Sequence, residues 1–169
     1  MFYLHKVSNE FWDIYDKNGG KTNIIKRKGD KLLPGEYHLA IEAWIVNSKG
    51  QILVQKRSHC CEVLPNFWGL TTGRLISGES SIDGCLREVK EELGLHIEKH
   101  DPFFLRRIFR TDMIWDIYII NKDFSIKELI LQKEEVSAAK WVTPSEFTSM
   151  IKAGDLFEYP EIYEILNSI

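Results

Sequence analysis

Residues 73–95 read GRLISGESSIDGCLREVKEELGL and contain the strongest helix signal in the chain. At about 100° per residue, the apolar side chains of this stretch fall on one stripe. The stripe consists of Ile82, Cys85, Leu86, Val89 and Leu93. Ser80 or Ser81 can cap the first turn, and Gly94 follows the last one. The stretch therefore predicts an amphipathic helix over residues 80–93 that packs on the core.

The polar face of this helix carries three glutamates, Glu88, Glu91 and Glu92, near its C-terminus. Like charges four residues apart cost about 0.2–0.5 kcal/mol per pair, and the helix dipole disfavours anions at this end. Clustered carboxylates suit a hard divalent cation such as Mg²⁺, which binds through oxygen ligands. A solvated acidic face is the alternative interpretation of these three residues taken alone.

The wider spacing favours the first interpretation. Gly73 is followed six positions later by Glu79, and Arg87 then opens the run Arg-Glu-Val-Lys-Glu-Glu-Leu-Gly-Leu. The stretch resembles the Nudix box, G-x5-E-x7-R-E-U-x-E-E-x-G-U with U aliphatic, and every specified position matches. Residues 37–57 are similar to the first hairpin of Nudix domains, and residues 134–144 to their closing strand and helix. The resemblance implies a hydrolase that uses Mg²⁺ or Mn²⁺ to cut a diphosphate linked to another moiety.

The pattern along the rest of the chain predicts a mixed α+β fold, because strands dominate and a few helices interrupt them. Strands are expected at residues 11–15, 22–27, 37–46, 52–55, 67–72, 103–110, 113–120 and 136–142. A second helix is expected from Pro144, with Thr143 as its N-cap and Glu146 at N3, and a third at about residues 160–166. The family fold implied by the resemblance is an α/β/α sandwich around a mixed β-sheet. We interpret residues 1–34 as an N-terminal hairpin extension of the same domain and residues 35–169 as the Nudix domain.

The resemblance also implies roles for the residues of the box. Glu88 and Glu92 would ligate the metal, and the carbonyl of Gly73 would complete the site. Arg87 would orient Glu91, and Glu79 would support the loop.

The general base has more than one candidate. By the resemblance, Glu91 either binds a further ion or takes the proton from water. In the family the base often comes instead from a later loop, where Glu134 and Glu135 are the candidates. A carboxylate suits this role, because metal ions make water more acidic and a nearby base then removes its proton.

Three further residues are candidates for phosphate or substrate binding. Arg57 ends a predicted strand and Arg74 lies in the box loop, where a guanidinium can bind phosphate oxygens. His38 begins a strand, and it is either a buried histidine with satisfied contacts or a ligand for phosphate or metal.

An isomerase is the closest alternative. The N-terminal part and residues 37–57 resemble the isopentenyl-diphosphate isomerase-like branch of the family. That isomerase needs a Cys before the box glycine, a metal-binding His after it and a Glu-x-Glu on a later strand. Here Thr72 and Arg74 flank Gly73, and residues 113–116 read MIWD. Only His38 matches a metal-binding histidine of the isomerase, so the hydrolase interpretation is favoured. A catalytically silent module that binds diphosphates is the other alternative.

Composition limits the remaining classes. The chain has 169 residues, 44% hydrophobic and 28% charged, with a net charge of −3, which indicates one globular domain and argues against a partner that is a nucleic acid polymer. No apolar run approaches the ~18 residues that span a bilayer, so no membrane association is expected. Three cysteines without a Cys-x-x-Cys pair indicate a reducing, cytoplasmic location. A small-molecule diphosphate is thus the expected partner, and the dimers common in the family leave a homodimer open.

Overall fold

The computed structural model describes residues 9–159 and 162–167. Its centre is a seven-stranded sheet in the order β5-β4-β3-β8-β7, with β6 added to β3 and β9 to β4. The strands are β3 (His38–Val46), β4 (Ile52–Arg57), β5 (Trp68–Gly69), β6 (Thr71–Arg74), β7 (Pro102–Arg110), β8 (Met113–Asn121) and β9 (Val136–Val142). The pair β3–β8 is parallel and the other pairs are antiparallel. The predicted mixed sheet is confirmed.

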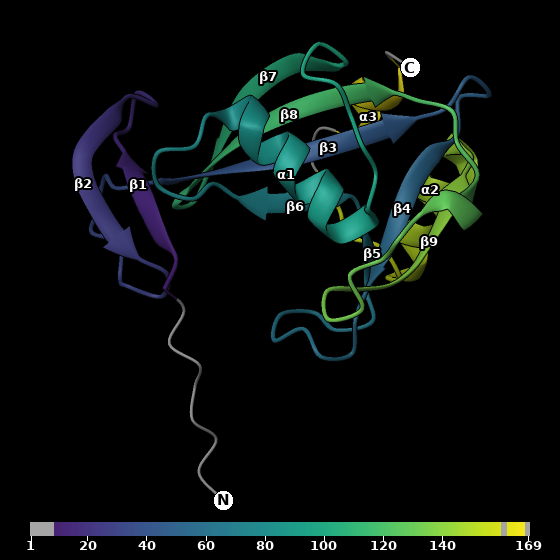
Figure 1. The fold of residues 1–169 in the computed structure, drawn as a ribbon, viewed down its shortest axis with the longest axis horizontal. Coiled ribbons are helices and arrows are strands. Elements are labelled where there is room, and N and C mark those ends of the chain that lie inside the picture. Colours follow the sequence, from purple (N-terminus) through teal and green to yellow (C-terminus); the bar gives the residue numbers. More distant parts are fainter. Residues whose placement is uncertain (1–8, 160–161, 168–169) are drawn as a thin grey trace, which may run out of the picture.

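Helices cover both faces of this sheet (Figure 1). On one face, α1 (Ser81–Leu93) inserts Cys85, Val89 and Leu93 into a core cluster that also contains alternate residues of β3. On the other face, α2 (Pro144–Ala153) and α3 (Ile162–Leu166) pack with Trp44. Because β3 is buried on both faces, it is apolar at most positions rather than at alternate ones, with His38 and Glu42 as its buried polar residues. This arrangement is the expected α/β/α sandwich.

The ends of the helices follow from their sequence. Ser80 caps α1 by accepting from the backbone N–H of Asp83, and Gly94 ends the helix in the left-handed conformation at φ 66°. Thr143 and Glu146 form the predicted capping box of α2. The expected start of the last helix at residue 160 lies outside the described residues. Within them, no helix is long and apolar enough to cross a membrane.

The N-terminal hairpin forms a small sheet of its own, β1 (Phe11–Tyr15) and β2 (Lys21–Arg27), at one end of the molecule (Figure 1). Tyr15 and Tyr37 exchange backbone hydrogen bonds of 2.9 Å, which continue this sheet toward β3. Asp13 ties the hairpin to the loop between β6 and α1. Its carboxylate accepts from the backbone N–H of Gly78 at 2.8 Å and from the Ser77 hydroxyl at 2.9 Å.

Two expectations about strands need correction. The hairpin of residues 37–55 forms its turn, but β3 and β4 pair only at Val46 and Ile52 and then separate. Beyond that point β6 pairs with the same edge of β3, while β4 pairs with β5 and β9. The strand expected over residues 67–72 is broken at Leu70, whose N–H donates to the hydroxyl of Tyr159 instead of to a neighbouring strand. Tertiary contacts of this kind are not visible in a local pattern.

Candidate active site

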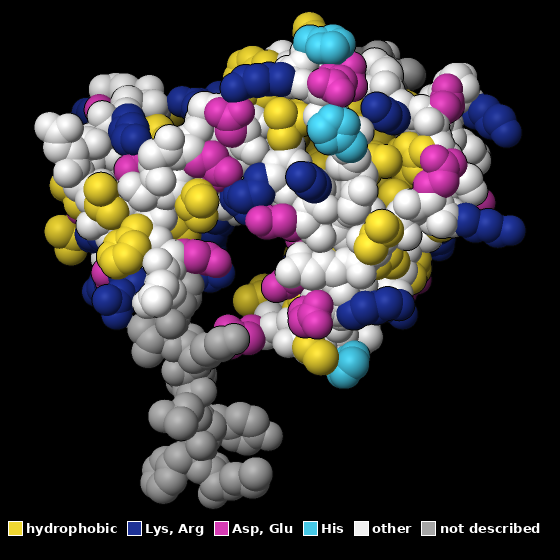
Figure 2. Space-filling model, viewed as in Figure 1, with side chains coloured by type: hydrophobic (Ala, Val, Ile, Leu, Met, Phe, Trp, Pro, Cys, Tyr) yellow, Lys and Arg dark blue, Asp and Glu magenta, His cyan; other side chains and the backbone are white. Residues whose placement is uncertain are grey.

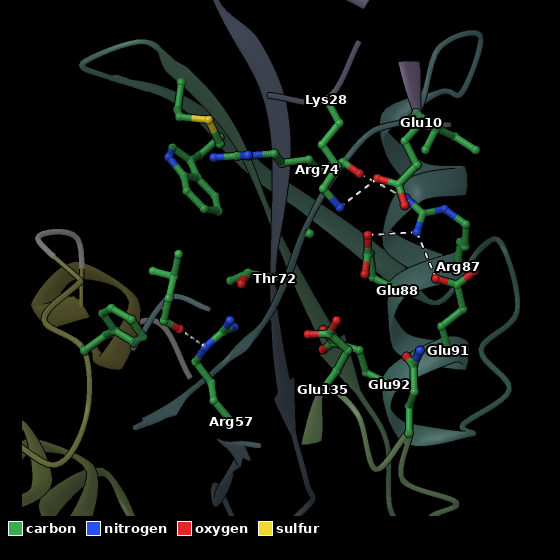
Figure 3. Close-up of a pocket in the computed structure, with 17 residues that line it drawn as sticks. Glu10, Lys28, Arg57, Thr72, Arg74, Arg87, Glu88, Glu91, Glu92 and Glu135 are labelled. Carbon is green, nitrogen blue, oxygen red and sulfur yellow. Dashed lines mark hydrogen bonds and ion pairs between the residues drawn. The ribbon is translucent and has the colours of Figure 1, made fainter. Parts of the chain in front are cut away.

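A cleft of about 510 Å³ opens where β4 separates from β3. Its acidic wall consists of Glu88, Glu91 and Glu92 on α1 and Glu135 on the loop before β9. Three cations, Lys28, Arg57 and Arg74, also line the cleft (Figure 3). Figure 2 shows the hollow between the N-terminal hairpin and the body of the molecule, with charged side chains around its rim.

Arg87 connects two glutamates of the acidic wall, Glu88 and Glu91, to each other and to the box loop. Its guanidinium donates to both carboxylate oxygens of Glu79, at 2.8 and 3.0 Å, and to the backbone carbonyl of Arg74 at 3.1 Å. Its Nη1 also donates to Glu88 at 2.8 Å and to Glu91 at 3.0 Å. Burial lowers the pKa of Arg87, but the bond to Glu79 and the charge of Glu88 outweigh burial and raise it. Arg87 thus joins the box loop to the helix through its bonds to Glu79 and Glu91.

Two of the glutamates, the buried Glu92 and the partly buried Glu88, have raised pKa values. Burial raises the pKa of Glu92 to about 8, with added repulsion from Glu88 and Glu135, although a bond from Gln55 lowers it. Burial also raises the pKa of Glu88 to about 7, against the opposing charge of Arg87. Without a bound cation, ionisation of either carboxyl group costs free energy. The residues thus provide concentrated negative charge that a bound cation would stabilise.

Gly73 lies directly against Glu88. A Cβ on Gly73 would stand 1.9 Å from Cδ of Glu88, so the side chain of Glu88 occupies the space that any other residue would fill. Gly73 pairs with Ile41 in the ladder between β6 and β3, which holds its backbone at the floor of the cleft. Only glycine allows the carboxylate to approach the strand this closely.

The residue types fit a hard divalent cation. All donors on the wall are carboxylate oxygens, and Glu88 lies in the cradle above Gly73, where a carbonyl group is also at hand. As the described side chains stand, no three His, Cys, Asp or Glu residues are grouped closely enough to hold a metal ion. In the same arrangement, one oxygen of Glu88 and one of Glu91 accept from Arg87, and one oxygen of Glu92 accepts from Gln55. A cation would have to compete with these donors.

The structure separates the three candidates for the base. Glu135 lines the cleft close to Glu92, whereas Glu134 is not among the lining residues. Glu91 lines the cleft but is ion-paired with Arg87, and half of its side chain is exposed. The Sγ of Cys61 lies 3.6 Å from Oε2 of Glu135, which places this cysteine at the edge of the site.

The three cations approach the cleft from different elements. Arg57 is held at the end of β4 by a bond from its Nε to the carbonyl of Val63 at 2.8 Å. Arg74 lies with its guanidinium 4.9 Å from the ring centre of Trp12. Lys28 follows β2 and forms an ion pair of 2.8 Å with Glu10. Sequence reasoning placed Arg57 and Arg74 but missed Lys28, because its position depends on how the hairpin docks.

His38 lies outside the lining of this cleft. Its ring packs against Trp12, with the ring centres 3.8 Å apart, and its side chain is 4% exposed. Burial lowers the pKa of His38 to about 4, with a further contribution from Arg74, so the ring is neutral at pH 7. The structure thus places His38 behind Trp12 and Arg74 rather than among the glutamates.

Residues 113–116 divide between the cleft and the core. Met113 and Trp115 line the cleft and provide an apolar wall. Asp116 is buried and accepts two bonds from Arg107, at 2.6 and 2.8 Å. No carboxylate of this segment faces the glutamates of α1.

Comparisons with known proteins agree with this geometry. A family model described as NUDIX domain matches residues 36–163. The chain is 38% identical over 159 residues to an uncharacterized Nudix hydrolase of Listeria monocytogenes, with 94% of each chain covered. It is 31% identical over 164 residues to Nudix hydrolase 3 of Arabidopsis thaliana, which covers 88% of this chain and 21% of that protein.

Solved structures share the fold. A Deinococcus radiodurans protein superposes with a TM-score of 0.77 at 21% identity, covering 94% of this chain and 98% of that one. The MutT protein of Methanosarcina mazei gives a TM-score of 0.61 at 23% identity, covering 78% of this chain and 94% of that one. From the match over residues 36–163 and the Listeria relative, the chain belongs to the Nudix family of hydrolases, which cleave a pyrophosphate bond in small molecules and generally use divalent metal ions.

Proposed function

We propose that this protein hydrolyses the diphosphate linkage of a nucleoside diphosphate or another organic diphosphate, with Mg²⁺ or Mn²⁺ bound at Glu88, Glu92 and the carbonyl of Gly73. The observation that carries the proposal is the position of two glutamates on α1: Glu92 is buried beside Gln55, and the partly buried Glu88 lies against Gly73. Burial raises the pKa of both carboxyl groups. A divalent cation at such a site neutralises charge on phosphate oxygens and makes water more acidic. A bound cation would compensate the charge of these carboxylates when they ionise.

The cations opposite this wall support a role in holding the diphosphate. Arg57, Arg74 and Lys28 approach the cleft from three separate elements, and guanidinium groups bind phosphate oxygens well. Held between these side chains and the acidic wall, the diphosphate would present one phosphorus atom to water.

Glu135 is the better supported base. It lines the cleft beside Glu92, whereas Glu91 is already ion-paired with Arg87 and Glu134 lies outside the lining. In the proposed reaction, Glu135 takes a proton from the attacking water. Loss of a general base typically costs about 10²–10⁴-fold in rate. Glu135→Gln should therefore lower kcat by that factor, while Glu91→Gln should lower kcat less.

The test is a screen of diphosphate metabolites with Mg²⁺ and with Mn²⁺, in which both products are identified. The screen covers nucleoside diphosphate sugars, dinucleotide polyphosphates, oxidised nucleotides and prenyl diphosphates. We expect ¹⁸O from labelled water in a phosphate product, because water attacks phosphorus. Glu92→Gln should lower kcat/KM by at least about 10²-fold, since loss of a ligand costs more than the 10–100-fold of an outer partner. Absence of turnover across the screen, or full activity in Glu92→Gln, would contradict the proposal.

The isomerase alternative is less well supported. Isopentenyl-diphosphate isomerase needs a cysteine before the box glycine and a Glu-x-Glu on a later strand, but in this chain Thr72 precedes Gly73. Met113 and Trp115 line the cleft, and the nearby Asp116 is taken by Arg107. Incubation with isopentenyl diphosphate should leave no dimethylallyl diphosphate; its appearance would favour the isomerase. Tight binding of a diphosphate without turnover would favour the silent module.

A further inference from the structure

A buried polar bridge joins three elements behind the acidic wall. Nε2 of Gln55, on β4, donates to Oε2 of Glu92, on α1, at 2.5 Å. The hydroxyl of Thr71, on β6, donates to Oε1 of Gln55 at 3.1 Å. The three side chains are 5%, 8% and 3% exposed for Gln55, Glu92 and Thr71. The bridge thus crosses the gap between β4 and α1 almost out of contact with water.

The bridge fixes the orientation of the Gln55 amide. A primary amide has one carbonyl acceptor and one NH₂ donor group, and burial without partners costs free energy. With its carbonyl paired to the Thr71 hydroxyl, the amide turns its NH₂ toward Glu92. Gln55 therefore offers Glu92 a donor in a fixed direction, and the bond occupies Oε2. Oε1 is left for a ligand in the cleft that Glu92 lines.

The neutral charge of this donor also matters. Glu88 is held by Arg87, a full positive charge that competes with any cation for the same carboxylate. Gln55 holds Glu92 with a dipole, so it orients the carboxylate without adding positive charge beside a divalent ion. The two glutamates are thus held by partners of different kinds, and only Arg87 belongs to the box motif.

We propose that Gln55, itself oriented by Thr71, is a positioning residue that holds Glu92 ready to bind the divalent cation. The inference rests on the proposed function, in which Glu92 is a metal ligand. Partners that orient metal ligands typically contribute 10–100-fold to metal affinity. Gln55 should contribute on this scale even though it touches neither the metal nor the substrate.

The experiment is a Mn²⁺ titration of the full chain, in which electron paramagnetic resonance measures the concentration of free Mn²⁺. This measurement needs no substrate. Gln55→Met keeps the shape but removes the NH₂ donor, and it should weaken Mn²⁺ binding by about 10–100-fold. Gln55→Asn keeps the amide on a side chain one methylene shorter and should lose a similar factor. Thr71→Val removes the hydroxyl and should lose less. The double variant Gln55→Met/Thr71→Val should bind as Gln55→Met does, because Thr71 acts only through Gln55.

The controls separate positioning from folding. Gln51→Leu changes an amide of the same hairpin that bonds to Asn47, and it should keep the wild-type affinity. Thermal melting in EDTA should show that the Gln55 variants are folded. Wild-type affinity in Gln55→Met and Gln55→Asn, or additive losses in the double variant, would overturn this inference alone. A wild-type protein that binds no Mn²⁺ would overturn the proposed metal site and this inference with it.

Discussion

Glu88 lies directly against Gly73 at the cleft. Glu88 fills the volume where a side chain at residue 73 would begin, and Arg87 holds its carboxylate there. The position of one proposed ligand therefore depends on the absence of a single carbon atom. Because this constraint is steric rather than electrostatic, a substitution tests it directly.

Gly73→Ala should expel Glu88 from its place, because the new Cβ would lie 1.9 Å from the carboxyl carbon. We expect kcat/KM to fall by at least about 10²-fold, more than the 10–100-fold typical of losing an outer partner. Steady-state kinetics and a Mn²⁺ titration provide the measurements. Gly50→Ala is the control: its φ of 70° strains the backbone, but its Cβ would meet nothing within 4 Å and the residue does not line the cleft. Equal losses in the two variants would show that the effect is not steric.

For single residues, the sequence predicted contacts within the box but did not predict that Gln55 and Lys28 lie beside it. The contacts of Arg87 with Glu79 and Glu91 follow from spacing along one helix and its preceding loop. Gln55 and Lys28 reach the site from strands and connectors far away in the chain, so no local pattern contains them. The sequence shows three basic residues at positions 26–28, but it does not show where they lie in the fold.

Among the elements, the N-terminal hairpin is linked through Asp13 to the loop between β6 and α1. Burial alone would raise the pKa of Asp13, but bonds from Gly78, Lys21 and Ser77 outweigh it and lower the pKa. The same hairpin brings Glu10 and Lys28 to the cleft. Asp13 thus couples the position of these side chains to the box.

Asp13→Ala should loosen the hairpin, because the backbone N–H of Gly78 and the hydroxyl of Ser77 lose their acceptor. The expected cost is about 1–3 kcal/mol for the partners left unpaired. Hydrogen exchange in residues 9–37 should become faster, and KM should rise more than kcat falls, because Lys28 is no longer held at the cleft. Asp16→Ala is the control, since Asp16 bonds only within the turn of the hairpin, to Asn18 and Gly20. Unchanged exchange in Asp13→Ala would contradict this role.

Elements with strong local signals were predicted well, and the misses have tertiary causes. The ranges of β1 and β9 match their predictions, as does the capping box of α2. The short helix at Ile126–Glu128 was missed, although Ser125 and Glu128 form a capping box whose spacing is readable in the sequence. The break at Leu70 depends on Tyr159, 89 positions away, and could not have been read locally.

For the whole molecule, the buried glutamates link stability to pH. The pKa of Glu92 is about 8 and that of Glu88 about 7 in the folded state, against about 4.3 for an exposed glutamate. The folded state therefore retains protons that the unfolded state has lost, and stability falls as pH rises toward 8. His38, with a folded pKa of about 4, acts in the opposite direction, but its effect is complete above about pH 6.5.

Without metal, the free energy of unfolding should therefore fall by about 1–2 kcal/mol between about pH 6.5 and 8. Urea denaturation in EDTA at these two pH values measures it. Glu92→Gln should reduce the fall, since the amide does not titrate. Excess Mg²⁺ should also reduce it, because a bound cation stabilises the ionised carboxylates. A fall of the same size in Glu92→Gln and wild type would assign the effect to other groups.

β3 and β4 separate after a single pair of residues, and this separation bears on how the substrate preference of such an enzyme can change. The acidic wall is carried by α1 and the loop before β9. Arg57, at the end of β4, and Val63, in the loop after it, lie on the opposite rim. Grafting a different segment into positions 62–66, with Ser58 and Cys61 kept because they contact Glu135, would remodel the recognition end and leave the hydrolytic apparatus in place. Chimeras made in this way would retarget the chemistry without rebuilding the scaffold.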